Sequence, residues 1–100
     1  MSIALTFTTS RRADATVVLA ATGEIDMSNA EAFSAALAAA RQEAAGDPFI
    51  VDLTRVEYID SAGLAALFPH VDQLQLLTTG LLAPVLTVAG LDDLLTIHEE

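Results

Sequence analysis

The chain has 100 residues, and its 14 acidic side chains outnumber its 4 basic ones, which gives a formal net charge of −10. Such a charge repels nucleic acids and anionic membranes, and no apolar run is long enough to span a bilayer, so we expect neither as a direct partner. With 53% hydrophobic residues and no cysteine, the sequence predicts one folded domain over residues 1–100, without disulfides and located in the cytoplasm.

Two strands are predicted at the start of the chain. Residues 3–8 alternate apolar and small polar side chains, and residues 16–22 are rich in β-branched side chains. The polar segment between them favours an antiparallel hairpin. Residues 23–26 are expected to end the second strand in a turn.

An alanine-rich helix is predicted next, over residues 30–45. Ser28 or Asn29 offers the short polar side chain that is favoured at a helix N-cap. The spacing of Phe33 and Leu37 places both on one helical face, which we expect to pack on the core.

The middle of the chain contains the most unusual junction. Residues 49–53 predict a short central strand that is buried on both faces. Asp60 and Ser61 then offer N-cap chemistry for an apolar helix, which Pro69 is expected to end or bend.

The last third predicts shorter elements. Residues 73–78 alternate well enough for an edge strand, although a continuing leucine-rich helix fits nearly as well. Residues 81–88 fit a helix with Pro84 in its first turn, Gly90 caps that helix, and residues 94–97 predict a last strand. The alternation of strands and helices favours an α/β fold, in which helices pack on a mixed sheet.

Three segments resemble STAS domains, and specifically bacterial anti-sigma factor antagonists. They are residues 22–26 (TGEID), 51–64 (VDLTRVEYIDSAGL) and 89–97 (AGLDDLLTI). The most specific part is a buried strand, a short loop and Asp-Ser-x-Gly-Leu at the start of a helix. The resemblance covers nearly the whole chain and implies a STAS-type small mixed β-sheet of four to five strands with helices packed on it.

The resemblance implies a regulatory binding module rather than an enzyme, and it implies no cofactor. In the family, the residue directly after the motif's aspartate is phosphorylated by a partner that is both anti-sigma factor and serine kinase; by position this is Ser61. The unphosphorylated antagonist binds the anti-sigma factor, phosphorylation breaks the complex, and a phosphoserine phosphatase resets it. The family's other acidic site residue corresponds to Asp26.

The residues around Ser61 suggest a physical reason why phosphorylation would weaken binding of the partner. If Ser61 caps its helix, its hydroxyl is exposed at the positive end of the helix dipole, where free amide hydrogens can hold a phosphate. A phosphate there, with Asp60 and Asp26 nearby and Gly63 in the same motif, would concentrate negative charge and repel a docked partner. We expect the partner to bind a surface of small and flexible side chains: Met27, Ser28, Ala62, Leu64 and Ala65.

Simpler roles stay open for the same residues. Asp60 and Ser61 also fit a plain helix cap, and Asp26 also fits a plain turn. An enzyme with Ser61 as nucleophile and His70 as base is disfavoured, because the G-x-S-x-G elbow is absent and the base lies beyond Pro69 on the same helix.

No metal site is expected. His70 and His98, the two histidines, do not have ligand spacing. A magnesium site built from Asp26, Asp52 and Asp60 would lack a lysine and a glycine-rich phosphate loop.

Two rival functions remain within the fold. STAS subunits of bacterial lipid transporters are similar in this strand, loop and helix, and they bind an ATPase. A degenerate STAS module that no longer switches is the other alternative, because residues 63–90 look shorter than in related proteins by roughly two helical turns of about 3.6 residues.

Overall fold

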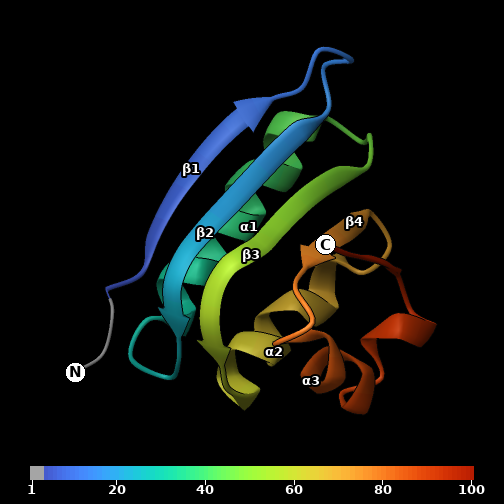
Figure 1. The fold of residues 1–100 in the computed structure, drawn as a ribbon. Coiled ribbons are helices and arrows are strands. Elements are labelled where there is room, and N and C mark those ends of the chain that lie inside the picture. The colour runs from blue at the N-terminus through green and yellow to red at the C-terminus, as the bar shows by residue number, and fades with distance from the viewer. Residues whose placement is uncertain (1–3) are drawn as a thin grey trace.

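The computed structural model describes residues 4–100, whose five strands form one sheet in chain order (Figure 1). The strands are β1 (Thr6–Arg11), β2 (Val17–Ile25), β3 (Phe49–Ile59), β4 (Leu74–Thr78) and β5 (Thr96–Glu99). β1 is antiparallel to β2, whereas β2, β3, β4 and β5 run parallel to their neighbours. The predicted mixed sheet, the hairpin and the central position of β3 are confirmed.

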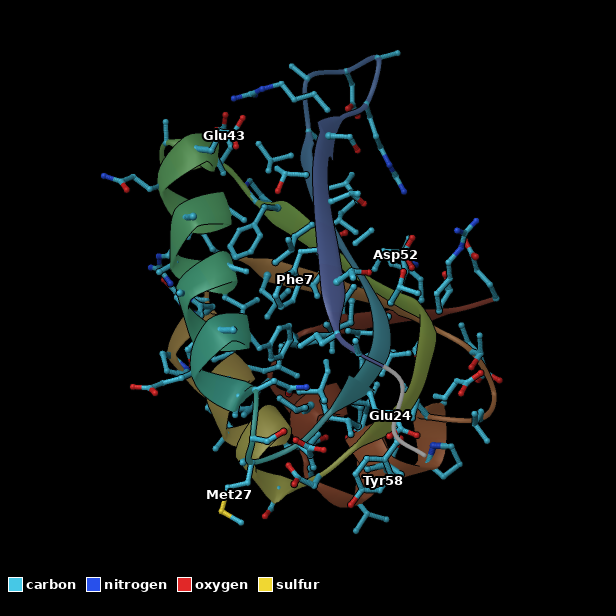
Figure 2. All side chains as sticks on the ribbon, turned by 90° about the vertical axis from the view of Figure 1, so that its left-hand side faces the viewer. Phe7, Glu24, Met27, Glu43, Asp52 and Tyr58 are labelled. Atoms are coloured by element: carbon cyan, nitrogen blue, oxygen red, sulfur yellow. The ribbon has the colours of Figure 1, made fainter. Side chains whose placement is uncertain are left out.

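Helices connect the parallel strands. They are α1 (Ala30–Ala44), α2 (Ser61–Leu67) and α3 (Ala83–Val88), with 3-10 turns η1 (Phe68–His70) and η2 (Leu91–Asp93). α1 lies along one side of the sheet (Figure 2). As predicted, Phe33 and Leu37 of α1 are fully buried, and Phe33 stacks on Phe7 of β1 with ring centroids 6.2 Å apart. No helix in residues 4–100 is both long and apolar enough to cross a membrane.

The strands before α2 differ from their predicted bounds. β1 begins at Thr6 and continues to Arg11; of the predicted strand, Ile3 lies outside the described part of the chain, and Ala4 and Leu5 precede the strand. β2 continues through the predicted turn to Ile25, and β3 runs on to Ile59 instead of ending near residue 53. The pairing of these two strands explains both extensions. After register shifts on either side of Thr22 and Gly23, β2 and β3 stay paired as far as Ile25 and Ile59, which lie opposite each other.

The second half resolves the open choice for residues 73–78. This segment is a strand, β4, but it is not at an edge, because β3 and β5 flank it. β5 starts at Thr96, two residues later than predicted, because η2 precedes it. Pro69 ends α2 as predicted, and the chain continues as the 3-10 turn η1.

Candidate functional site

The candidate site lies at one end of the sheet, where β2 and β3 finish and where α1 and α2 begin (Figure 1). The two strand ends are joined directly, since the Asp60 backbone N–H donates a hydrogen bond to the Ile25 carbonyl at 3.1 Å. The loop after β2 and the junction after β3 are therefore held side by side, which brings together residues that are far apart in the sequence.

The Asp60 carboxylate makes the central contacts of this site. Its Oδ1 accepts hydrogen bonds from the backbone N–H groups of Ala62 at 2.9 Å and Gly63 at 3.1 Å, so Asp60 is the N-cap of α2. Its Oδ2 accepts a hydrogen bond from the Met27 backbone N–H at 3.1 Å. One side chain therefore fixes both the start of α2 and the loop that leads into α1.

Ser61 is the first residue of α2, and it is exposed. Of the two residues predicted to offer N-cap chemistry, Asp60 caps the helix and the Ser61 hydroxyl does not. The structure also differs on the amide hydrogens that were expected to hold a phosphate: those of Ala62 and Gly63 are bound to Asp60. A group on Ser61 would instead lie beside a carboxylate.

Gly63 sets how closely α2 approaches the strand ends. A Cβ atom at this buried position would lie 2.6 Å from Cγ2 of Ile25 and 2.7 Å from Cγ1 of Ile59. Both isoleucines are buried in the core, so they cannot easily move aside. The glycine therefore positions the helix that presents Ser61.

Asp26 holds the β2–α1 loop in a tight turn. Its Oδ1 accepts hydrogen bonds from the Ser28 backbone N–H at 2.9 Å and from the Ser28 hydroxyl at 2.5 Å. These bonds, the hydroxyl's first, hold the pKa of the Asp26 carboxyl below its ordinary value. Asp26 therefore carries its negative charge at neutral pH.

Asn29 is the loop residue whose role the sequence did not reveal. It occupies the N-cap position of α1 but makes no side-chain cap bond. Its Oδ1 instead accepts from the Asp26 N–H at 2.9 Å, and its Nδ2 donates to the Glu24 carbonyl at 2.8 Å. The short polar side chain was the available signal, since asparagine often binds nearby backbone in turns.

The predicted partner-binding residues gather at this end of the molecule. Met27 is the most exposed of them, at 81%, and it projects from the end of the fold together with Tyr58 (Figure 2). Ser28 and Ala65 are exposed, whereas Ala62 and Leu64 are half-buried. Sequence reasoning missed Tyr58, a residue of β3 that is nevertheless 50% exposed.

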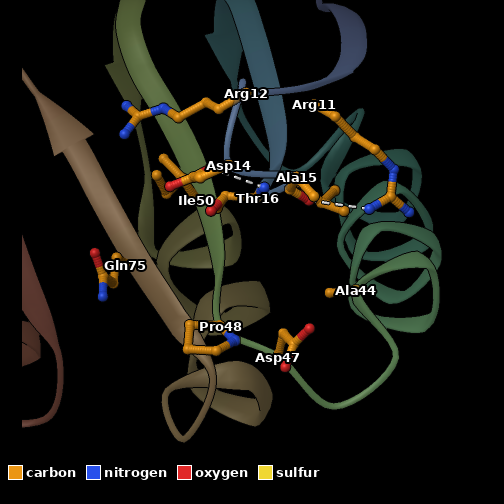
Figure 3. A pocket seen from close by; sticks show the side chains of 11 residues that line it. Arg11, Arg12, Asp14, Ala15, Thr16, Ala44, Asp47, Pro48, Ile50 and Gln75 are labelled. Carbon is orange, nitrogen blue, oxygen red and sulfur yellow. Dashed lines mark hydrogen bonds between the residues drawn. The ribbon is translucent and has the colours of Figure 1, made fainter.

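Two hollows flank the described fold. An apolar groove of about 370 Å³ separates α2 from α3. A second hollow, of about 490 Å³, lies at the hairpin turn between β1 and β2 (Figure 3). Arg11 in its wall is already engaged, because it donates to the carbonyls of Ala15 at 3.0 Å and Glu43 at 3.2 Å.

The residues considered for a metal or for catalysis are engaged elsewhere. Within residues 4–100, no three histidine or acidic side chains come together as a metal site. Asp52 accepts from the Thr54 N–H at 2.9 Å and hydroxyl at 2.6 Å. His70 lies beside Arg41, with its Nδ1 3.3 Å from Nη1 of that arginine.

The chain belongs to the STAS domain family. A family model described as "Mlab, STAS domain" matches residues 8–96, which run from the third residue of β1 to the first residue of β5. A search of curated proteins found no match.

Solved structures share the same fold. An anti-sigma factor antagonist from Mycobacterium paratuberculosis is 25% identical, with a TM-score of 0.83 over 98% of this chain and 90% of the other. The anti-sigma factor antagonist SpoIIAA, solved in its unphosphorylated form, is 20% identical, with a TM-score of 0.73 over 95% and 88%. A STAS-domain antagonist from Rhodobacter sphaeroides is 20% identical, with a TM-score of 0.57 over 74% and 84%.

Proposed function

We propose that this STAS domain is an anti-sigma factor antagonist that works by partner switching and is not an enzyme. In its unphosphorylated form it binds an anti-sigma factor that is also a serine kinase. Phosphorylation of Ser61 releases it, and a phosphoserine phosphatase resets it. The observation that carries the proposal is the exposed Ser61 directly after Asp60, the residue that fixes both α2 and the neighbouring loop. The likeness to the Mycobacterium paratuberculosis antagonist supports it.

The release mechanism follows from charge. A phosphate adds roughly −1.5 to −2 charges at neutral pH. At Ser61 it would stand beside the Asp60 carboxylate, whose capping bonds already use the Ala62 and Gly63 amides. Asp26 on the adjoining loop adds another negative charge. The phosphate therefore stays exposed toward the partner, where it imposes repulsion and a desolvation cost on docking.

Incubation with ATP and an anti-sigma factor kinase, sought first among the neighbouring genes, tests the proposal. Intact mass and peptide mass spectrometry are expected to find one phosphate, on Ser61. Ser61→Ala is expected to abolish it, and Ser34→Ala, at an exposed serine of α1, is the matched control. Addition of a phosphoserine phosphatase is expected to restore the original mass.

The short α2 favours a second candidate, a STAS subunit that does not switch, for example in a lipid-transport ATPase complex. This helix has only seven residues before Phe68 and Pro69 continue it as a 3-10 turn. Such a subunit would form a stable complex with its partner and take up no phosphate. That combination in the same experiment would contradict partner switching and support the second candidate.

A further inference from the structure

α3 is apolar on almost every side. Leu86 faces the core and is fully buried, but Val85 is 38% exposed and Val88 is 89% exposed. Thr87 is the polar residue among the six that form the helix. A helix that is hydrophobic all round is normally covered on all sides, and in residues 4–100 nothing covers this outer face.

The exposed face of α3 forms one wall of the groove against α2. Five apolar residues line this groove, which has a volume of about 370 Å³: Leu64, Pro84, Val85, Val88 and Ala89. Leu64 is one helical turn after Ser61, so the groove opens directly beside the phosphorylation site proposed above. α2 and α3 lie next to each other at this end of the fold (Figure 1).

Charge around the groove indicates what can fill it. Acidic residues stand next to the segments that line the groove: Asp60 precedes α2, and Asp92 and Asp93 of η2 follow α3, whereas residues 56–100 contain no arginine or lysine. Three of the four arginines lie elsewhere or are neutralised: Arg11 and Arg12 line the hollow at the hairpin turn, and Arg41 is paired with Asp72 at 2.8 Å. An apolar groove with an acidic surround favours an apolar segment with basic flanks, and it disfavours a second copy of this acidic chain.

We propose that the groove between α2 and α3 seats an amphipathic helix of the anti-sigma factor, with its apolar face on Val85 and Val88 and its basic residues toward the acidic surround. This proposal rests on the proposed function for the identity of the partner. It extends the docking surface from Ser61 across Leu64 to α3, and phosphate on Ser61 would then stand at the rim of the seated helix.

Binding of synthetic 18-residue helical peptides tests the groove without the partner. A Leu/Lys peptide with one apolar face is expected to bind the full chain, whereas a Leu/Glu peptide and a Ser/Lys peptide are not. Val88→Asp is expected to weaken Leu/Lys binding at least about tenfold, because a carboxylate would enter the apolar contact. Thr87→Asp is the matched control, since it adds the same charge on the same helix outside the groove.

Several results would overturn the proposal. Equal affinities of the Val88→Asp and Thr87→Asp variants for the Leu/Lys peptide would do so, and so would equal binding of the Leu/Lys and Ser/Lys peptides. Sedimentation that shows a dimer of the free chain, abolished by Val88→Asp, would assign the groove to a second copy. Circular dichroism of each variant checks the fold, and Val85→Asp repeats the test at a second wall residue.

Binding measurements with the anti-sigma factor distinguish failure of the groove proposal from failure of the proposed function. If Ser61→Asp releases the anti-sigma factor but Val88→Asp binds it as tightly as the original chain, the groove proposal fails and partner switching stands. If the peptides bind as expected but Ser61 takes up no phosphate, partner switching fails and the groove stands as a docking site.

Discussion

Gly63 and Ile25 are in such close contact that a Cβ on the glycine would lie 2.6 Å from Cγ2 of the isoleucine. The contact joins α2 to the end of β2. Ile59, at the end of β3, is equally close, because the same added Cβ would lie 2.7 Å from its Cγ1. The exposed serine is therefore presented by a helix whose position is set by backbone proximity rather than by a long side chain.

Gly63→Ala is expected to destabilise the protein. The added methyl group overpacks the contact with Ile25 and Ile59, which typically costs about 1–3 kcal/mol. Urea unfolding measures the change. Gly80→Ala is the control, because the Cβ there meets only the flexible end of Glu99, at 3.0 Å. Equal unfolding midpoints for the two variants would contradict this account of Gly63.

Asp60 variants are expected to separate the helix cap from the loop contact. Asp60→Ala loses both, and loss of the cap alone costs about 1 kcal/mol. Asp60→Asn keeps one acceptor oxygen for the α2 amides but loses the acceptor of the Met27 N–H. Thermal unfolding is expected to rank the Ala variant below the Asn variant.

Hydrogen exchange completes the comparison of the Asp60 variants. The Met27 amide is expected to exchange faster in both of them than in the original chain. Asp92→Ala, at an exposed acidic residue of η2, serves as the control and leaves that amide unchanged. Unaltered protection of Met27 in Asp60→Asn would show that the loop does not depend on this carboxylate.

Protonation of His70 is expected to lower stability in mildly acidic solution. Burial first, and then the charge of Arg41, lower the pKa of this imidazole below 6.5. The unfolded chain therefore takes up the proton first, so the free energy of unfolding falls as the pH drops below 6.5 toward the lower folded pKa. Urea unfolding across this range is expected to show the slope in the original chain and a weaker slope in His70→Gln, with His98→Gln as control.

Ser61→Asp is expected to release the partner without unfolding the protein. An acidic residue in the first turn of a helix is favourable by about 0.3–1 kcal/mol, and repulsion from Asp60 opposes this gain. We therefore expect a thermal midpoint close to that of the original chain and an affinity for the anti-sigma factor at least about tenfold weaker, measured by calorimetry. Ser34→Asp, on the exposed side of α1, is expected to change neither quantity.

Local chemistry explains what the sequence could predict. The alanine-rich α1, the stop at Pro69 and the polar junction at residues 60–61 all depend on residues within one or two helical turns. The sequence left Asp60 and Ser61 as alternative caps, because the two choices differ by a helix boundary of one residue, which local residue preferences do not fix.

Features that depend on distant contacts could not be predicted in the same way. Gly23 and the residues after it look like a turn, but pairing with β3 carries β2 on to Ile25. The tight contact of Gly63 exists only once both strand ends are placed. The sequence predicts a helix at residues 81–88, but only the fold shows that Val88 on this helix is exposed.

The strands of the sheet lie in the same order in space as in the chain. No strand has to insert between two strands that are already paired. Each new strand can therefore pair with the edge strand of the sheet formed before it. During synthesis, β1, β2, α1 and β3 can associate before β4 and β5 leave the ribosome. We expect the serine-bearing end of the molecule to assemble with this first half, and the groove wall supplied by α3 to be completed last.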